Sequence, residues 1–149
     1  LAVALGSALI GGIDYAAWAA EASHRIPQAA IPSRIDRSTL AVARDLVRRW
    51  PEDPRGRILL GAAHLVDAHP IEAEREFRAV LAMAPTDAAH SFQRSAVSTA
   101  RAYLALALVA QNRIAEAQLH ADELCDRHSP VAPQFRSLRP LLVKAKVCR

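Results

Sequence analysis

The stretches RRWPEDPR (48–55) and AMAPTDA (82–88) decide the fold of this chain. Each carries the end of a helical segment into a proline turn, and Pro51 and Pro85 lie 34 residues apart. A period of about 34 residues is typical of proteins built from repeated helix pairs, which bury a common core by stacking. The abundance of alanine and the scarcity of aromatic residues also favour closely packed helices over a β-sandwich. The sequence therefore predicts an all-α protein.

The residues between the two prolines fit a known repeat. With Pro85 as the closing proline, the positions of a Leu-Gly pair, a small residue, an aromatic residue and a last core residue are filled by Leu60, Gly61, Ala73, Phe77 and Leu81. Gly61 and Ala73 are expected to be small because two helices cross there, and Phe77 is expected to fill the space toward the next repeat. The region resembles the tetratricopeptide (TPR) repeat family, which implies a short α-solenoid of antiparallel helix pairs.

A second copy follows in RAYLALALVAQNRIAEAQLHADELC (101–125), with Ala105 and Ala117 at its two small positions. Asn112 tolerates the left-handed conformation that ends a helix, so 111–113 is the predicted turn of this copy. In the first copy the turn is 68–70, where Pro70 suits the first position of a helix. The two copies are offset by 44 residues, so ten extra residues interrupt the period, and we place them within 86–98 as an extended helix start or a protruding loop.

Helices are also expected on both sides of the two copies. Residues 38–50 have apolar positions at helical spacing and predict the second helix of an incomplete earlier repeat, with Ser38 as its N-cap. Residues 134–147 predict one capping helix, because the last repeat of a solenoid would otherwise expose its apolar face. The apolar side of this helix contains Phe135, Leu138, Leu141 and Leu142. The helical domain thus covers 38–149, behind a proline-containing linker at 23–37.

Residues 1–22 predict a hydrophobic N-terminal helix. Residues 1–13 are apolar, which is too short for a bilayer span of roughly 20 residues, and Tyr15 and Trp18 suit the interfacial belt. Because the chain begins with Leu1, we expect 1–20 to be the end of a transmembrane segment that anchors the domain. The alternative is an Ala/Leu-rich helix that packs on the domain.

The sequence predicts neither catalysis nor metal or cofactor binding. It lacks a phosphate-binding loop, a nucleophile elbow and the HExxH motif. Its histidines form only loose groups, His64 and His69 around Asp67 and His120 and His128 around 122–125, and we expect a buried His64 and an exposed His69. The net charge of +4 comes from 17 Arg and 2 Lys scattered beside acidic residues, which is typical of solvated helix faces and argues against a nucleic-acid partner.

A protein or peptide partner is expected in a concave groove on the inner faces of the first helices. By register the groove residues are Arg55, Ile58, Ala62, Leu65, Ala102, Leu106 and Val109. The alternative is that the linker or the terminal helix fills this groove and completes the core.

Cys125 and Cys148 are the two cysteines of the chain. In an oxidising compartment a bond between them would tie the terminal helix to the repeat. The alternative is two separate thiols, because an antiparallel last helix would carry Cys148 away from Cys125 unless it is short or crosses obliquely.

The whole order of segments, from the apolar stretch through WPEDPR (50–55) to LALALVAQNRIAEA (104–117) and a late cysteine, is similar to the C-terminal extension of some bacterial rhomboid-family intramembrane serine proteases. This resemblance implies an appended domain, since the catalytic Ser and His of that family lie in membrane helices that this chain does not contain. It also implies that the domain lies outside the cytoplasm on the bacterial inner membrane. We therefore expect a membrane-tethered, non-catalytic interaction scaffold, or alternatively the accessory domain of such a protease.

Overall fold

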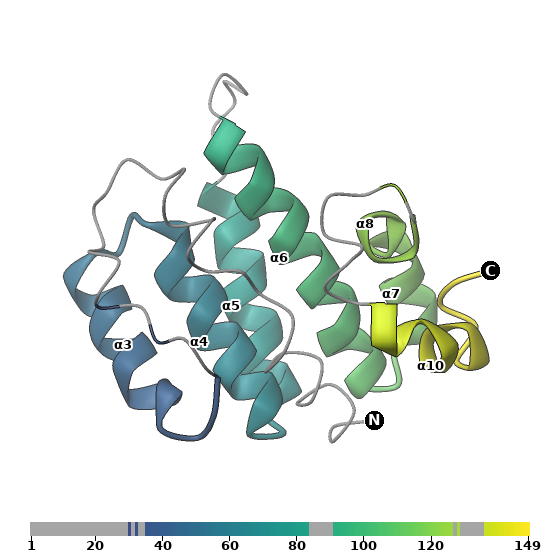
Figure 1. Ribbon diagram of the computed structural model, residues 1–149, viewed down its shortest axis with the longest axis horizontal. Coiled ribbons are helices and arrows are strands. Elements are labelled where there is room, and N and C mark those ends of the chain that lie inside the picture. Colours follow the sequence, from purple (N-terminus) through teal and green to yellow (C-terminus); the bar gives the residue numbers. More distant parts are fainter. Residues whose placement is uncertain (1–29, 31, 33–34, 84–90, 127, 129–135) are drawn as a thin grey trace.

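The described part of the protein is helical. The computed structural model describes residues 30, 32, 35–83, 91–126, 128 and 136–149, and no strand occurs among them. The elements are α3 (Thr39–Arg49), α4 (Pro54–Val66), α5 (Pro70–Met83), α6 (Ser91–Ala110), α7 (Ile114–Leu119), α8 (Asp122–Cys125), the 3₁₀ turn η2 (Arg136–Leu138) and α10 (Arg139–Lys144). Each helix from α3 to α6 packs on the next, α4 also contacts α6, and α7 and α8 pack on α6 (Figure 1). The all-α prediction is confirmed.

The contact between α4 and α5 depends on one glycine. A Cβ atom on Gly61 would lie 2.6 Å from Cε1 and 2.7 Å from Cζ of Phe77, so only glycine lets the Phe77 ring lie against α4. The same ring stacks on Tyr103 of α6, with ring centroids 5.3 Å apart and planes 12° from parallel. Phe77 therefore joins α4, α5 and α6, which is the role expected for it. The last core position of α5 belongs to buried Val80, whereas Leu81 is only half-buried.

Three helix ends share one backbone motif. Ala68, Asn112 and Lys146 adopt positive φ angles of 60°, 59° and 62°. At each end the next residue donates its N–H to the carbonyl five residues earlier, as His69 does to His64 at 2.8 Å and Val147 does to Leu142 at 2.9 Å. This is the Schellman motif, which satisfies carbonyls that a helix end would leave unpaired. The left-handed Asn112 and the helix start at Pro70 agree with the sequence prediction.

The prediction that Ser38 caps α3 is wrong. Ser38 itself adopts helical φ and ψ and makes no side-chain cap hydrogen bond. Its N–H donates instead to Oδ1 of Asp36 at 2.8 Å, and the Asp36 N–H donates to the Thr39 hydroxyl at 2.9 Å. The helical turn begins earlier than the apolar pattern indicated, so Asp36 takes the capping role.

Two further predictions about helix extent are now settled in part. Residues 91–98 of the predicted insertion form the first turns of α6, a 20-residue helix, so for this part the prediction of an extended helix start is confirmed. Residues 86–90 lie outside the described part of the chain. The C-terminal helix is shorter than predicted, since only η2 and the six residues of α10 are helical. Pro140 fits only the first turn of α10, and the left-handed Lys146 ends it. Leu138 and Leu142 are buried, whereas Leu141 is exposed and 134–135 are not described.

The predictions for 1–22 and for most of the linker concern residues outside the described part of the chain. Among the helices that are described, none combines the length and the apolar character that a bilayer crossing needs.

Candidate functional site

The seven predicted groove residues all lie in the interior. Four belong to α4 and three to α6, and the two helices contact each other. None of the seven is more than 4% exposed: they are Arg55, Ile58, Ala62, Leu65, Ala102, Leu106 and Val109. The structure therefore brings both predicted sets into one core, and neither set lines an open surface. Binding at these residues remains a prediction. It requires that the segments packed over them move away.

Arg55 is the one charged member of this set, and its charge is compensated locally. Its guanidinium donates to the carboxylate of Asp53, at 2.7 Å from Nη2 to Oδ2 and 3.1 Å from Nε to Oδ1. The side chains are 2% and 4% exposed. Asp53 also accepts the backbone N–H of Arg55 at 3.0 Å and so caps α4. An ion pair buried this deeply holds the start of α4 and offers no free charge to a partner.

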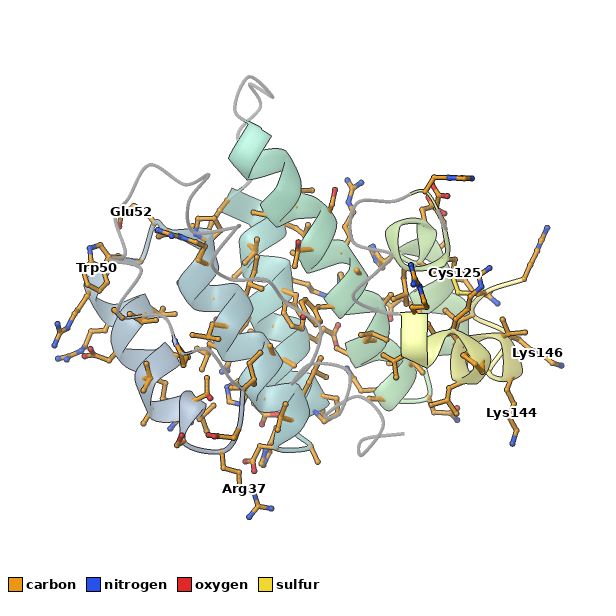
Figure 2. All side chains as sticks on the ribbon, in the orientation of Figure 1. Arg37, Trp50, Glu52, Cys125, Lys144 and Lys146 are labelled. Carbon is orange, nitrogen blue, oxygen red and sulfur yellow. A yellow bond between two sulfur atoms is a disulfide. The ribbon has the colours of Figure 1, made fainter. Side chains whose placement is uncertain are left out.

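Two of the described linker residues belong to or pack on the same core, whereas Asp36 and Arg37 are exposed. Ile35 is 1% exposed, and Ala30 packs against the core cluster that contains the groove residues. Arg37 Nε lies 3.3 Å from Oδ1 of Asp67, the residue that ends α4 two positions after Leu65. The end of the linker therefore lies beside the C-terminal end of α4, and Figure 2 shows Arg37 at the edge of the molecule. This arrangement agrees with the alternative in which the linker completes the core.

A polar network that the sequence did not single out joins the two copies. Glu74 of α5 accepts hydrogen bonds from Gln111 at 2.7 Å, from Arg113 at 2.7 Å and from Arg78 at 2.8 Å. Arg78 and Arg113 both also contact Glu116 of α7. Although burial acts to raise the pKa of Glu74, the hydrogen bonds from Gln111 and Arg78 and the charge of Arg113 hold it below the usual value. The sequence feature that could have indicated this network is the high density of charged residues in 72–78, which we interpreted as a solvated helix face.

The histidines lie as expected for structural residues. His64 is buried and its Nδ1 has no hydrogen-bond partner among the described residues, while the exposed His69 has Nδ1 3.1 Å from Oδ2 of Asp67. Burial, with the charge of Arg44, lowers the pKa of His64, which favours the neutral form of this imidazole in the folded protein. Within the described ranges, no three His, Cys, Asp or Glu residues are grouped as a metal ion would require.

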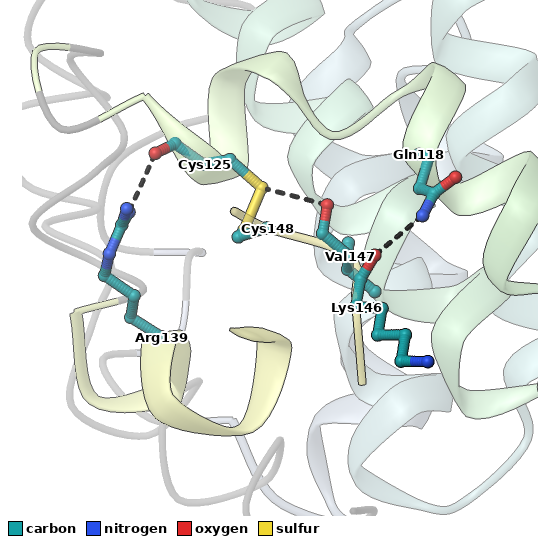
Figure 3. Close-up of a disulfide and its surroundings, with 6 residues drawn as sticks. All are labelled: Gln118, Cys125, Arg139, Lys146, Val147 and Cys148. Atoms are coloured by element: carbon teal, nitrogen blue, oxygen red, sulfur yellow. Dashed lines mark hydrogen bonds between the residues drawn. A yellow bond between two sulfur atoms is a disulfide. The ribbon is translucent and has the colours of Figure 1, made fainter. Parts of the chain in front are cut away.

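Cys125 and Cys148 form a disulfide bond, with Cα atoms 5.4 Å apart across a sequence separation of 23 residues (Figure 3). The short α10 and the reversal at Lys146 bring Cys148 back toward α8, which a full-length antiparallel helix would have prevented. Sγ of Cys125 also lies 3.7 Å from the carbonyl oxygen of Val147; because the bonded sulfur has no proton, this is a packing contact. The bond ties the terminal segment to the second copy.

Comparison with known proteins identifies no relative. No family model, no curated protein and no solved structure matches this chain.

Proposed function

We propose that this chain is a TPR-like interaction scaffold without catalytic activity of its own, anchored to a membrane through residues 1–20. The observation that carries the proposal is the packing of Phe77 between Gly61 and Tyr103, because it joins α4, α5 and α6 in the way that neighbouring helix pairs of a repeat are joined. The equivalent helix ends at Ala68 and Asn112 support the same repeat.

The proposed ligand is an apolar or helical peptide that binds between α4 and α6. The predicted groove residues are apolar apart from Arg55, whose charge Asp53 neutralises. They are buried and share a core cluster with Ile35, so we take the linker as the segment that the peptide displaces; the apparent affinity of the peptide is then reduced to the extent that the linker-out state is rare.

Selection from a displayed library of random 15-residue peptides tests this binding, with Ile35→Ala as the bait because it weakens linker packing. Peptides recovered should slow amide exchange in α4 and α6 when they bind, and binding should persist in the wild-type protein at lower affinity. If no peptide is recovered, or if the protected amides lie elsewhere, the proposed groove is not the binding site.

The membrane anchor is tested separately by alkaline carbonate extraction of the full gene product from bacterial cells. Wild-type protein should stay in the membrane pellet, and the double variant Leu9→Arg/Ile10→Arg should move to the supernatant, because each charge costs about 2.5–3.5 kcal/mol in the bilayer centre. Ser23→Arg in the linker is the control and should leave the protein in the pellet. Extraction of the wild type would refute the anchor.

A second candidate is the accessory domain of a rhomboid-type intramembrane protease. The Cys125–Cys148 bond supports it, because disulfides persist in oxidising compartments and so favour a domain outside the cytoplasm of a bacterial inner-membrane protein. The gene upstream of the Leu1 codon decides between the candidates. Six further hydrophobic spans, with a Ser in a Gly-rich setting and a later membrane His, would establish the protease; a single span would favour the free-standing scaffold.

A further inference from the structure

The C-terminal cap, defined here as residues 136–148, is held to the repeats by few interactions. The neighbour on which α10 mainly packs is the adjacent turn η2. Gln118 of α7 donates to the carbonyl of Lys146 at 2.6 Å, and Nη1 of Arg139 donates to the carbonyl of Cys125 at 2.7 Å (Figure 3). Buried Leu138 and Leu142 supply the apolar contact. Besides the backbone, the disulfide is the covalent cross-link between the cap and α8.

Both cysteines line an open pocket of about 550 Å³. Its other lining residues come from α7, α8 and the end of the cap, including Gln118, Asp122 and Val147. Cys125 is half-buried, whereas Cys148 is only 5% exposed. Because Cys125 is the more exposed of the two residues, we take its sulfur as the point of attack for a thiolate that enters the pocket, with Cys148 as the leaving group. Disulfide exchange depends on such access.

We propose that the Cys125–Cys148 bond is a redox latch that a dithiol opens by exchange while the repeats stay folded. A thiolate of the dithiol bonds to Cys125 Sγ, the bond between the two cysteines breaks, and Cys148 leaves as a thiolate that takes up a proton. The second thiol of the dithiol then displaces Cys125, which also takes up a proton. The dithiol ends as a cyclic disulfide and the protein as two thiols, so two electrons have passed to the protein.

Opening the latch releases the cap from the end of the second copy. Val147 and Cys148 are buried, and their N–H groups both donate to the carbonyl of Leu142, at 2.9 and 3.3 Å. Without the bond, the ties that the described residues show are the hydrogen bonds from Gln118 and Arg139 and the buried side chains of Leu138, Leu142 and Val147. Release should enlarge the opening of the pocket at Ala121, which lines it beside Val147 and Cys148.

Amide exchange followed by NMR tests the latch in the oxidised protein and after treatment with dithiothreitol. Reduction, verified by a mass gain of two hydrogen atoms, should speed exchange of the Val147 and Cys148 amides at least tenfold and leave α4 and α5 unchanged. Without any reductant, the double variant Cys125→Ser/Cys148→Ser should show the exchange rates of the reduced protein. Wild-type protein that is reduced, freed of dithiothreitol and reoxidised should return to slow exchange.

Three results would overturn the proposal. The first is a bond that resists dithiothreitol in the folded protein and is reduced only as fast as the chain unfolds globally. The second is slow exchange of the cap amides after reduction, which would show that the bond does not control the cap. Faster exchange of α4 and α5 together with the cap would show that the bond stabilises the whole domain and is not a local latch.

Discussion

A Cβ atom on Gly61 would lie 2.6 Å from Cε1 of Phe77, a distance that real side chains do not tolerate. The Phe77 ring is also fully buried and stacks on Tyr103, so a shift of the ring would disturb its packing on α6. This relationship fixes the spacing of α4 and α5, and it makes their packing sensitive to any side chain at position 61.

Gly61→Ala should lower the free energy of unfolding, although alanine is the better helix former by about 1 kcal/mol. Overpacking a core costs about 1–3 kcal/mol, so after subtracting the helix-propensity gain we expect a net loss of up to about 2 kcal/mol in the unfolding free energy measured by urea denaturation. In a protein that already carries Phe77→Leu, Gly61→Ala should lower the unfolding free energy by less than it does in the wild type.

Gly56→Ala is the matched control on the same helix, since its Cβ would meet Val47 Cγ2 at 3.3 Å, where a small shift suffices. It should change stability by less than about 1 kcal/mol. Equal effects of the two substitutions would contradict the packing role of Gly61.

Ala68→Gly should stabilise the protein. Ala68 adopts φ 60°, a left-handed conformation that costs an L-residue roughly 1–2 kcal/mol and glycine very little. Because glycine also gains freedom in the unfolded chain, we expect a net increase of about 0.5–1 kcal/mol in the unfolding free energy. Ala41→Gly, at an exposed interior position of α3, should lower it by a similar amount, and a loss at both positions would argue against the Schellman motif at Ala68.

Asp53→Asn should be among the most destabilising polar substitutions. It removes the carboxylate charge from a buried ion pair with Arg55, and breaking a buried pair typically costs about 3–5 kcal/mol. Asp45→Asn removes a carboxylate of exposed pairs with Arg48 and Arg49 and should have a much smaller effect on the chemical denaturation midpoint. Similar shifts for both variants would mean that the Asp53–Arg55 pair is not insulated from water.

His64 should make the domain less stable in mild acid. Burial and then Arg44 lower its pKa from 6.5, while Glu72 and Glu76 oppose the shift and His69 adds to it. As the pH drops, the unfolded chain therefore binds a proton on His64 more readily than the folded protein does. The free energy of unfolding falls as the pH drops below about 6.5 toward the folded pKa. The urea midpoint should fall more between pH 7.5 and 5.5 for the wild type than for His64→Gln. Parallel falls would show that His64 titrates normally.

Several packing and turn positions could be predicted from the sequence because each imposes a local size or backbone requirement. Gly61, Ala73 and Phe77 are recognisable by spacing, and Asn112 by its tolerance of positive φ. The cap of α3 could not be recognised, because Ser38 and Asp36 are both good caps and the first turn begins ahead of the apolar pattern. The extent of the last helix was misjudged because Lys146 gives no signal that it will adopt a left-handed conformation.

The state of the groove residues could not be predicted at all. Their register on α4 and α6 says which way they face, but burial depends on what packs over them, and that is set by contacts between segments distant in sequence. Ile35 illustrates the difficulty: the pattern around it is that of a proline-containing linker, yet it is as buried as the helical core. The Glu74 network depends in the same way on residues about 40 positions apart.

The affinity of one peptide recovered with Ile35→Ala, measured by fluorescence anisotropy on wild type and variants, tests the scaffold most directly. Ile35→Ala should bind at least tenfold more tightly than wild type, because the linker no longer competes, whereas Val42→Ala on exposed α3 surface should bind as the wild type does. Circular dichroism would verify that each variant is folded. Equal affinities for wild type and Ile35→Ala would contradict the account, because the linker would then not lie between the peptide and its groove.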